Sequence, residues 1–318
     1  MQQSHQGVRY IAISDEYATQ RIDNFLIRLL KGVPRSHVYR VLRAGEVRVN
    51  KKRVKPSYRL QSGDSVRVPP VNVKIQHFKQ LGKPRQRQLL EQVLYEDAEL
   101  LIINKPAGVP VHGGSGIDAG VVELLRQAKP EWQQLELVHR LDKGTSGCLM
   151  LAKKRSMLRA LHDLLRQGAV TKYYLVLVAG QWPQAKQSEQ RIDLPLLKYH
   201  LSSGEHRVKV SPEGKSAISY FTVVQSFKQT SLVRVRLETG RTHQIRVHAA
   251  HSGHPVIGDE KYGDAELNQY MKQRGCGRMF LHAEMLSLIL PTTQQPLTVT
   301  AELTPNLTQL LKELAHDA

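Results

Sequence analysis

The sequence predicts an α+β protein made of a small basic N-terminal module and a larger domain around a mixed or antiparallel sheet. Two observations carry this prediction. Positive charge gathers near the amino terminus, and the apolar pattern changes from short helical stripes to long strand-like runs after a polar stretch near residue 80. A chain of 318 residues with 41% hydrophobic content is long enough to bury the cores of two domains.

The N-terminal module begins with a helical pattern. Residues 21–30, RIDNFLIRLL, place their apolar side chains on one stripe, and a second short helix follows from about residue 35 until Gly45. The segments EVRVN, RVKPSYRL and SVRVPP then alternate around a turn at Gly63, which predicts a few antiparallel strands. We expect this module to occupy residues 18–81.

The next stretch is typical of a linker. It contains Pro69, Pro70, Gly82 and Pro84 among Lys, Arg and Gln, and it has no long apolar stripe. We therefore expect a linker at 82–90 and a second domain at 91–318.

The second domain is expected to be rich in strands. Apolar or alternating runs bounded by Gly, Pro or charge predict strands at ELLIINKPAG, GCLMLAKK, KYYLVLVAG, HRVKVS, AISYFTVV and SLVRVRLE. Helices are predicted at 121–129, 156–166, 242–251 and 307–314. This order of elements fits an α+β domain better than a regular alternation of strands and helices.

The charge distribution indicates a polyanionic partner. The formal net charge is +18, and residues 21–59 hold 12 Lys or Arg against the two acids Asp23 and Glu46, which gives 12 − 2 = +10. A merely solvated face would mix both signs, and a membrane-binding helix would combine a basic face with exposed aromatic residues. Phosphate groups are therefore the favoured partner.

Cysteine content and hydropathy bear on the compartment. Cys148 and Cys276 lie far apart with no C-x-x-C spacing, so the sequence predicts neither a disulfide framework nor a thiolate zinc site. The first residues lack the apolar core of a signal peptide, and no stretch approaches the length of a membrane span. We expect a cytoplasmic protein that does not contact membranes.

The segment 137–154, LVHRLDKGTSGCLMLAKK, carries the first candidate for chemistry. Asp142 is the only carboxylate between Glu136 and Asp163, and Arg140 and Lys143 flank it in a polar loop ahead of an apolar run. Neighbouring cations keep a carboxylate ionised and suited to nucleophilic or base work. An ordinary turn aspartate explains the same spacing equally well, so both interpretations stand.

The segment 238–255, ETGRTHQIRVHAAHSGHP, is dense in arginine and histidine. His248, His251 and His254 have a three-residue spacing that invites a metal hypothesis, but no cysteine accompanies them and Pro255 ends any helix there. Contact with phosphate or with bases is the better interpretation. We expect no metal site.

Several familiar motifs are missing. The sequence contains no G-x-x-x-x-G-K-[ST], no dinucleotide-binding fingerprint after a strand, and no G-x-S-x-G. The adjacent tyrosines at 173–174 are expected to face opposite sides of a strand, with a packed aromatic ring as the default interpretation. Nucleotide-triphosphate, NAD and serine-hydrolase chemistry are therefore not indicated.

The motif HRLDKGTSG resembles the signature loop of the RluA-type pseudouridine synthases, in the branch that acts on large-subunit ribosomal RNA. Four more segments resemble motifs of that family in the same order: NKPAG at 104–108, KYY at 172–174, GRTHQIRVH at 240–248 and FLHAEML at 280–286. Residues 18–81 likewise resemble the alpha-L RNA-binding module of ribosomal proteins.

The resemblance implies roles for individual residues. Asp142 would be the catalytic aspartate, Tyr174 the stacking and proton-handling tyrosine, and Arg246 the arginine that pairs with the aspartate. Arg140 would fill the gap left by a flipped base. Lys172 selects Tyr174 over its neighbour through the Lys-x-Tyr spacing of the motif. Further RNA contacts are expected from basic residues of the module and of the arginine motif, namely Arg35, Arg40, Arg43, Lys51, Lys52, Arg53, Arg241 and His243.

The implied reaction isomerises uridine to pseudouridine in large-subunit ribosomal RNA without a cofactor, and we expect the enzyme to act as a monomer. A carboxylate can attack the anomeric carbon, attack carbon six of the base, or promote elimination to a glycal, and the sequence does not choose among these. Two other hypotheses remain: a non-catalytic RNA-binding or ribosome-assembly protein, and an RNA hydrolase, for which a second carboxylate or metal triad is missing.

Overall fold

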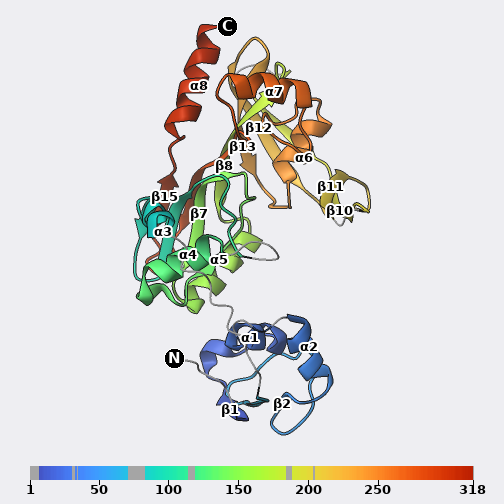
Figure 1. Cartoon of the computed structure of the whole chain (residues 1–318), viewed down its shortest axis with the longest axis vertical. Helices are drawn as coiled ribbons and strands as arrows, with labels where there is room; N and C mark the ends of the chain where they lie inside the picture. The colour runs from blue at the N-terminus through green and yellow to red at the C-terminus, as the bar shows by residue number, and fades with distance from the viewer. Residues whose placement is uncertain are drawn as a thin grey trace. The chain divides into compact units, whose positions relative to one another are not determined.

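A computed structural model describes residues 7–30, 33, 35–70, 83–113, 119–183, 188–202 and 205–317 of the chain (Figure 1). The chain divides into two compact units, Met1–Gln80 and Leu81–Ala318. No helix in these described ranges is both long and apolar enough to cross a membrane.

The smaller unit combines two helices with a three-stranded sheet in the order β1-β3-β2. Apolar side chains of both helices and all three strands form one core cluster, which includes Phe25, Leu26, Val41 and Val66. The elements are β1 (Arg9–Ala12), a 3-10 turn (Asp15–Tyr17), α1 (Ile22–Leu29), α2 (Arg35–Arg43), β2 (Arg48–Val49) and β3 (Ser65–Val68).

Both helices of this unit lie where the apolar spacing predicts them, but the third strand does not. RVKPSYRL forms no strand. Its centre is a turn in which the amide of Tyr58 donates to the carbonyl of Lys55, and Pro56 has no amide to give to a ladder. The third strand is β1, which pairs antiparallel with β3.

A tight hairpin carries three of the basic residues of this unit. The amide and carbonyl of Val49 bond to the carbonyl and amide of Lys52, so only Asn50 and Lys51 make the turn. Both have positive φ, 48° and 66°, as a two-residue hairpin of this kind requires. Lys51, Lys52 and Arg53 are therefore exposed around its tip.

The larger unit is built on a mixed sheet of ten strands. Its path is β4-β5-β7-β14-β8-β13-β12-β9, with β6 paired to β7 and β15 paired to β14, and β10 and β11 form a separate hairpin. The strands are β4 (Val93–Glu96), β5 (Leu100–Lys105), β6 (Glu136–Leu137), β7 (Ser146–Ala152), β8 (Thr171–Ala179), β9 (Glu189–Asp193), β10 (Leu196–His200), β11 (His206–Val210), β12 (Ile218–Ser226), β13 (Thr230–Leu237), β14 (Leu281–Ile289) and β15 (Pro296–Thr300).

Both faces of this sheet are covered. In β8, Tyr174 and Val176 belong to the main core cluster, whereas Leu175 and Leu177 pack on the opposite face with side chains of α7 and α8. Figure 1 shows α4 and α5 beside the β7 end of the unit and α6 and α7 beside the β12 and β13 end. The helices are α3 (Lys83–Leu90), α4 (Val121–Ala128), a 3-10 turn (Pro130–Trp132), α5 (Arg155–Arg166), α6 (Gln244–His251), α7 (Ala265–Gln273) and α8 (Pro305–His316).

The α+β class and the mixed sheet confirm the sequence prediction, with one difference at the start of the unit. Where the sequence predicts a linker at 82–90, residues 83–90 form helix α3, which contacts α4 and buries Leu89. A single buried leucine among Lys, Arg and Gln leaves no apolar stripe to read. Residues 71–82, of which only residue 82 belongs to the expected linker, lie outside the described part of the chain.

A close approach between two strands fixes the polar loop before β7. Strands β7 and β14 run parallel, with Ser146 opposite His282 and Gly147 opposite Ala283. A Cβ at Gly147 would lie 2.2 Å from the carbonyl oxygen of Ala283, and the φ of Gly147 is +108°. Only glycine fits here, so the loop that carries Asp142 leaves the sheet along one defined path.

Candidate active site

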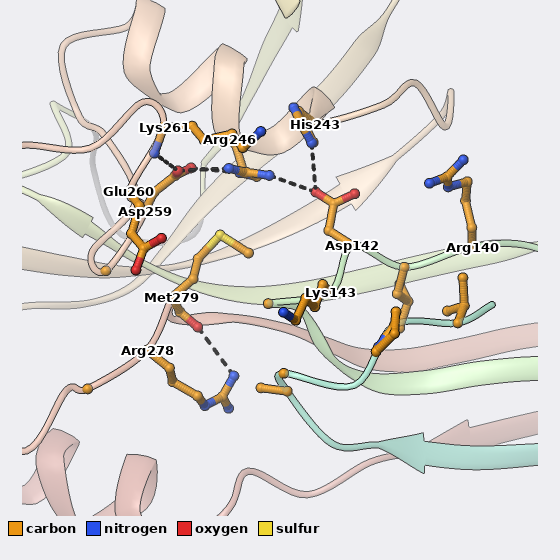
Figure 2. Close-up of a pocket in the computed structure, with 18 of the residues that line it drawn as sticks. Arg140, Asp142, Lys143, His243, Arg246, Asp259, Glu260, Lys261, Arg278 and Met279 are labelled. Carbon is orange, nitrogen blue, oxygen red and sulfur yellow. Dashed lines mark hydrogen bonds and ion pairs between the residues drawn. The ribbon is translucent and has the colours of Figure 1, made fainter. Parts of the chain in front are cut away.

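A large pocket opens on the loop that precedes β7. Its volume is about 1140 Å³, above the usual range for a small-molecule site, and its lining includes Arg140, Asp142, His243, Arg246 and Arg278. Figure 2 shows Asp142 with its carboxylate turned toward Arg246 and His243. The loop of HRLDKGTSG and the helix of GRTHQIRVH, 104 residues apart, therefore meet at one carboxylate.

Arg246 links two carboxylates. Its Nη1 donates to Oδ2 of Asp142 at 2.9 Å, while its Nε and Nη2 donate to the two carboxylate oxygens of Asp259 at 2.6 and 2.8 Å. Burial alone would lower the pKa of Arg246, but the two carboxylates raise it well above its ordinary value. The guanidinium is permanently charged and held in one orientation by the bidentate pair.

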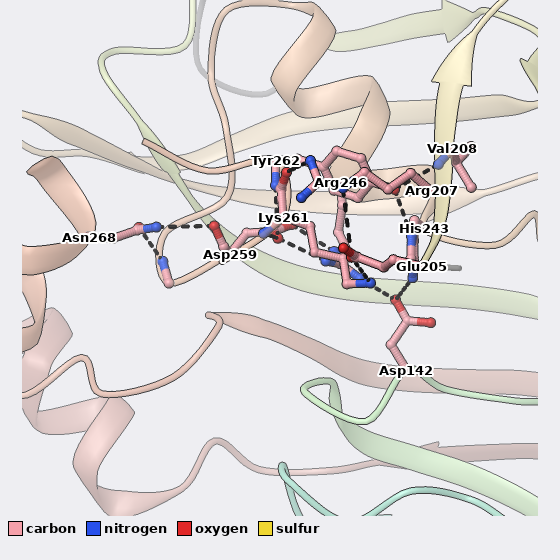
Figure 3. A network of polar contacts seen from close by, with 11 residues as sticks. Asp142, Glu205, Arg207, Val208, His243, Arg246, Asp259, Lys261, Tyr262 and Asn268 are labelled. Carbon is pink, nitrogen blue, oxygen red and sulfur yellow. Dashed lines mark hydrogen bonds and ion pairs between the residues drawn. The ribbon is translucent and has the colours of Figure 1, made fainter. Parts of the chain in front are cut away.

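Asp259 is a site residue that the sequence reasoning missed. Its carboxylate is fully buried, and Oδ1 also accepts the backbone amides of Lys261 and Tyr262 at 2.8 and 3.2 Å. Burial would raise the pKa of Asp259, but Arg246 and these amides hold it below its ordinary value. Figure 3 shows the chain of contacts from Asn268 through Asp259 and Arg246 to Asp142.

His243 lies beside the same carboxylate oxygen. Its Nε2 is 3.7 Å from Oδ2 of Asp142, and its Nδ1 is 2.8 Å from the hydroxyl of Tyr262. That hydroxyl already accepts the amide of Val208 at 2.9 Å, so its own proton is free for Nδ1 of His243. Burial lowers the pKa of His243 to about 4, so near neutral pH the ring is uncharged and its Nε2–H faces Asp142.

Tyr174 is buried at the centre of β8 and packs in the same core cluster as Leu141. Burial raises the pKa of its phenol, and the nearby charge of Asp142 raises it further, so the hydroxyl keeps its proton. Tyr173 points to the other face of the sheet. The structure therefore places Tyr174, and not Tyr173, on the side of the loop that carries Asp142, although Tyr174 is not among the residues that line the pocket.

Lys105 of the NKPAG segment stabilises the loop that carries Asp142 by hydrogen bonds to backbone carbonyls. It is fully buried, and its Nζ donates to the carbonyls of Pro106 and Val109 at 2.9 Å and approaches the carbonyl of Lys143 at 3.4 Å. The amide of Gly108 also donates to the carbonyl of Lys143 at 2.8 Å. Burial lowers the pKa of Lys105 to about 7. These contacts join the loops of two motifs into one support for Asp142.

The other expected RNA contacts of this unit lie in different places. Arg140 is exposed and lines the pocket, and Figure 2 shows it apart from Arg246, on the far side of Asp142. Arg241 is exposed, and its Nε donates to the carbonyl of Ser216 at 2.9 Å. Arg241 is not among the residues that line the pocket, so the structure brings only Arg140 and His243 to it.

In the smaller unit the expected RNA-binding residues are exposed. Arg40 and Arg43 lie along α2, and the side chain of Arg53 lies over Gly45 just beyond the end of that helix. The hairpin of Lys51 and Lys52 therefore adjoins α2. Arg35 is the first residue of α2, and its side chain lies outside the described part of the chain.

The histidines that invited a metal hypothesis have separate environments. His248 is buried with its Nδ1 3.1 Å from the hydroxyl of Ser219 and its Nε2 3.0 Å from the carbonyl of Leu194. His254 contacts the carbonyl of Ala179 at 2.8 Å, and His251 is exposed. Across the described ranges, no group of three or more His, Cys, Asp or Glu side chains is arranged to hold a metal ion.

Comparisons with known proteins identify the family of the chain. Residues 99–251 match the model of the RNA pseudouridylate synthase family, and residues 20–66 match the S4 domain. The chain is 48% identical to the ribosomal large subunit pseudouridine synthase C of Pasteurella multocida over 98% of this chain and 95% of that protein. It is also 48% identical to the protein of the same name from Escherichia coli strain K12, over 98% of both chains.

A solved structure shares the fold of the larger unit. The human RNA pseudouridylate synthase domain containing 4 superposes with a TM-score of 0.59 and 26% identity, covering 73% of this chain and 96% of that one. The resemblance to pseudouridine synthases and to an RNA-binding module is thus confirmed. The chain belongs to the RNA pseudouridylate synthase family and carries an S4 domain ahead of its catalytic domain.

Proposed function

We propose that this enzyme converts specific uridines of large-subunit ribosomal RNA to pseudouridine, using Asp142 as the reactive carboxylate and no cofactor. One observation carries the assignment of the residue. Asp142 is the pocket carboxylate that an arginine orients while one oxygen stays open, because Arg246 holds only Oδ2 and the described residues give Oδ1 no hydrogen bond, whereas Glu260, which also lines the pocket, has no such partner in the described part of the chain. The names of the bacterial relatives support the choice of RNA.

The reaction rearranges bonds within one nucleotide. The bond from the ribose anomeric carbon to N1 of uracil breaks, the base turns, and the anomeric carbon bonds to carbon five instead. Carbon five then loses its hydrogen as a proton, and N1 gains one, so no atoms are gained or lost overall. A carboxylate that is ionised and aimed can act as the nucleophile or base that such a rearrangement needs.

Arg246 and Tyr174 fit supporting roles in this scheme. Arg246 orients Asp142 through a 2.9 Å charge-assisted hydrogen bond, and Asp259 fixes the direction of the guanidinium. The hydroxyl of Tyr174 stays protonated and makes no hydrogen bond with the described residues. Tyr174 is buried behind the pocket lining, and we propose that its ring stacks under, or its hydroxyl exchanges a proton with, a base that lies against Asp142.

The target base must leave its stack to reach Asp142, which costs a few kcal/mol. Arg140 is exposed at the pocket and is placed to fill the space that the base leaves. The basic S4 unit supplies affinity that offsets part of this cost. We propose that residues 18–81 bind the RNA and that residues 91–318 catalyse the reaction.

We propose that the enzyme acts as a monomer. A ribosomal RNA substrate supports a cytoplasmic location. The molar mass measured by light scattering, with and without RNA, tests the first statement, and fractionation of cells tests the second.

The main experiment follows release of tritium from carbon five of uracil in large-subunit ribosomal RNA transcripts. Wild-type protein is expected to release tritium, and Asp142→Asn is expected to release none while it still binds the RNA. Release by Asp142→Asn at the wild-type rate would refute the assigned role. Chain cleavage or abasic sites would indicate a hydrolase, and no release from any transcript or precursor particle would refute the proposed activity.

A further inference from the structure

Arg278 is one of three arginines that line the pocket, and it differs from Arg246 in having no carboxylate partner. Its Nη1 donates to the carbonyl of Met279 at 3.2 Å, and its Nη2 donates to the hydroxyl of Ser146 at 3.0 Å. In the described part of the chain no acidic side chain lies within ion-pair distance of it. A half-buried cation held only by neutral acceptors keeps its charge available to a ligand.

The neutral acceptors are themselves fixed. Nε2 of His282 donates to the carbonyl of Ala301 at 2.9 Å, so Nδ1 must accept, and the hydroxyl of Ser146 donates to it at 2.8 Å. Burial lowers the pKa of His282, which keeps the ring neutral. The oxygen of Ser146 is then left to accept from Arg278. The guanidinium of Arg278 is thus held in one direction by hydrogen bonds, and no acidic group neutralises its charge.

The anchor of this arrangement is rigid. Ser146 and His282 are register partners in the parallel pair β7–β14, and both are buried. The backbone of Arg278 is also confined, because Gly258 approaches its carbonyl so closely that a Cβ there would lie 2.2 Å away. An anion site built on sheet residues is preorganised, so binding loses little conformational entropy.

The surroundings favour a phosphodiester as the ligand. Lys105 is close enough to Arg278 for the two cations to repel, and Lys143 and Lys272 also line the pocket. Among the acids of the lining, Asp142 and Asp259 are already bonded to Arg246, which leaves Glu260 as the single acid set against Arg278, Lys143 and Lys272. Figure 2 shows Arg278 on the opposite side of Asp142 from Arg140. The side of the pocket around Arg278 therefore has an excess of positive charge, and RNA brings one negative charge per linkage.

We propose that Arg278 binds a backbone phosphate next to the target uridine and so sets how deeply that nucleotide enters the pocket. The inference rests on the proposed function, because it takes RNA to be the occupant. A guanidinium with unused N–H groups matches the geometry of a phosphate. Arg278 would act as a positioning residue and would not take part in the bond changes at the base.

The first test measures binding of full-length protein to a large-subunit ribosomal RNA transcript between about 50 and 200 mM KCl. Arg278→Gln is expected to weaken binding about tenfold and to reduce the slope of log affinity against log salt by about one. Arg278→Lys should keep the slope but bind more weakly than wild type. Arg234→Gln is the matched control, because Arg234 is exposed and already paired bidentately with Glu284.

The second test removes the charge from the RNA. Single methylphosphonate linkages are placed on either side of the target uridine, and KM and kcat are measured by tritium release. The KM of wild type is expected to rise about tenfold when one of these linkages is replaced. The KM of Arg278→Gln should not rise further with the same replacement. An equal rise of KM in both proteins at every linkage would overturn the proposal. An unchanged salt slope in Arg278→Gln would overturn it as well.

The two proposals fail in different ways. If wild type binds RNA but releases no tritium, the proposed activity fails, and the salt slope still decides the role of Arg278. If Arg278→Gln lowers kcat alone, with KM and salt slope as in wild type, Arg278 acts on the reacting base and the phosphate site is refuted. Arg278→Lys keeps the test valid where Arg278→Gln folds poorly.

Discussion

The two units of this protein hold positive charge in opposite ways. In the S4 unit the basic side chains Arg40, Arg43 and Lys52 are exposed, and only two acids occur in the 39 residues from 21 to 59. In the catalytic unit Arg246 and Lys105 are buried, and each is held by several acceptors. Exposed charge attracts RNA from a distance and is weakened by salt, whereas buried charge acts on one atom and is hardly screened.

The largest effect is expected when the buried arginine is removed. Arg246→Met leaves Asp142 without its donor and Asp259 as a buried charge without a partner, so activity should fall by at least about 10³-fold. The free energy of unfolding should fall by about 3–5 kcal/mol. Both tryptophans, Trp132 and Trp182, lie in the catalytic unit, so their fluorescence during urea unfolding reports its stability.

The control for this prediction is Arg234→Met, which removes an exposed pair with Glu284 on the same sheet. It should cost less than about 1 kcal/mol and leave activity unchanged. Equal losses of stability in the two variants would mean that burial does not distinguish these arginines, and the contrast between exposed and buried charge would not hold.

The next largest effect concerns the two adjacent tyrosines. Tyr174→Phe removes a hydroxyl on the side of Asp142, and kcat should fall by about 10²-fold if that hydroxyl handles a proton. Tyr173→Phe changes the other face of β8 and should leave kcat within a factor of about two of wild type. Single-turnover rates of tritium release measure both. A larger loss in Tyr173→Phe would reverse the assignment.

A smaller effect is expected from the exposed charge of the S4 unit. Replacing Arg40, Arg43 and Lys52 together by Gln should weaken RNA binding by about tenfold to a hundredfold and reduce the salt slope by about two to three. The value of kcat at saturating RNA should not change. Binding curves over a range of KCl concentrations measure the slope.

The control for that variant removes the same charge from the catalytic unit, through Arg166→Gln, Lys228→Gln and Lys312→Gln. These residues are exposed, and none of them lines the pocket. If the control flattens the salt dependence as much as the S4 variant, total charge rather than its placement governs binding.

The last effect is a dependence of stability on pH, and it is the smallest when taken over one pH unit. The pKa of Lys105 is about 7 in the folded protein and near 10.5 when unfolded, so between these values the unfolded chain binds more protons. Stability contributed by this group therefore rises with pH over that window, by up to about 1.4 kcal/mol per pH unit. The unfolding free energy of wild type minus that of Lys105→Met should therefore increase as the pH rises through this window. Parallel pH curves for the two proteins would contradict the assignment.

Periodic apolar patterns predicted most of the fold. The helices expected at 121–129 and 156–166 appear as α4 and α5, and the six expected strands of the larger domain appear as β5, β7, β8, β11, β12 and β13. Helix α7 was not predicted, because Met271 is its only fully buried side chain and it shows no stripe. Strand β1 was missed because its pairing with β3 joins residues more than fifty positions apart.

The site was predicted in part. The motif resemblance indicated Asp142 and Arg246, and the structure joins them through a hydrogen bond. Asp259 was missed because it reaches Arg246 only through a turn, and a lone aspartate after HPVIG carries no spacing signal. Arg278 was missed because its distinguishing property is the absence of an acidic partner, which only three-dimensional structure reveals.

The contact from Arg246 to a single oxygen of Asp142 makes the carboxylate chemically asymmetric. Oδ2 accepts from Nη1 and also lies near Nε2 of His243, whereas Oδ1 accepts no hydrogen bond from the described residues. If the reaction passes through an ester, that ester should form through Oδ1 alone, while Oδ2 stays with the guanidinium throughout. Isotopic oxygen taken up from water during hydrolysis of a trapped ester would then enter a single, defined position, so the two oxygens of one side chain would have different chemical histories.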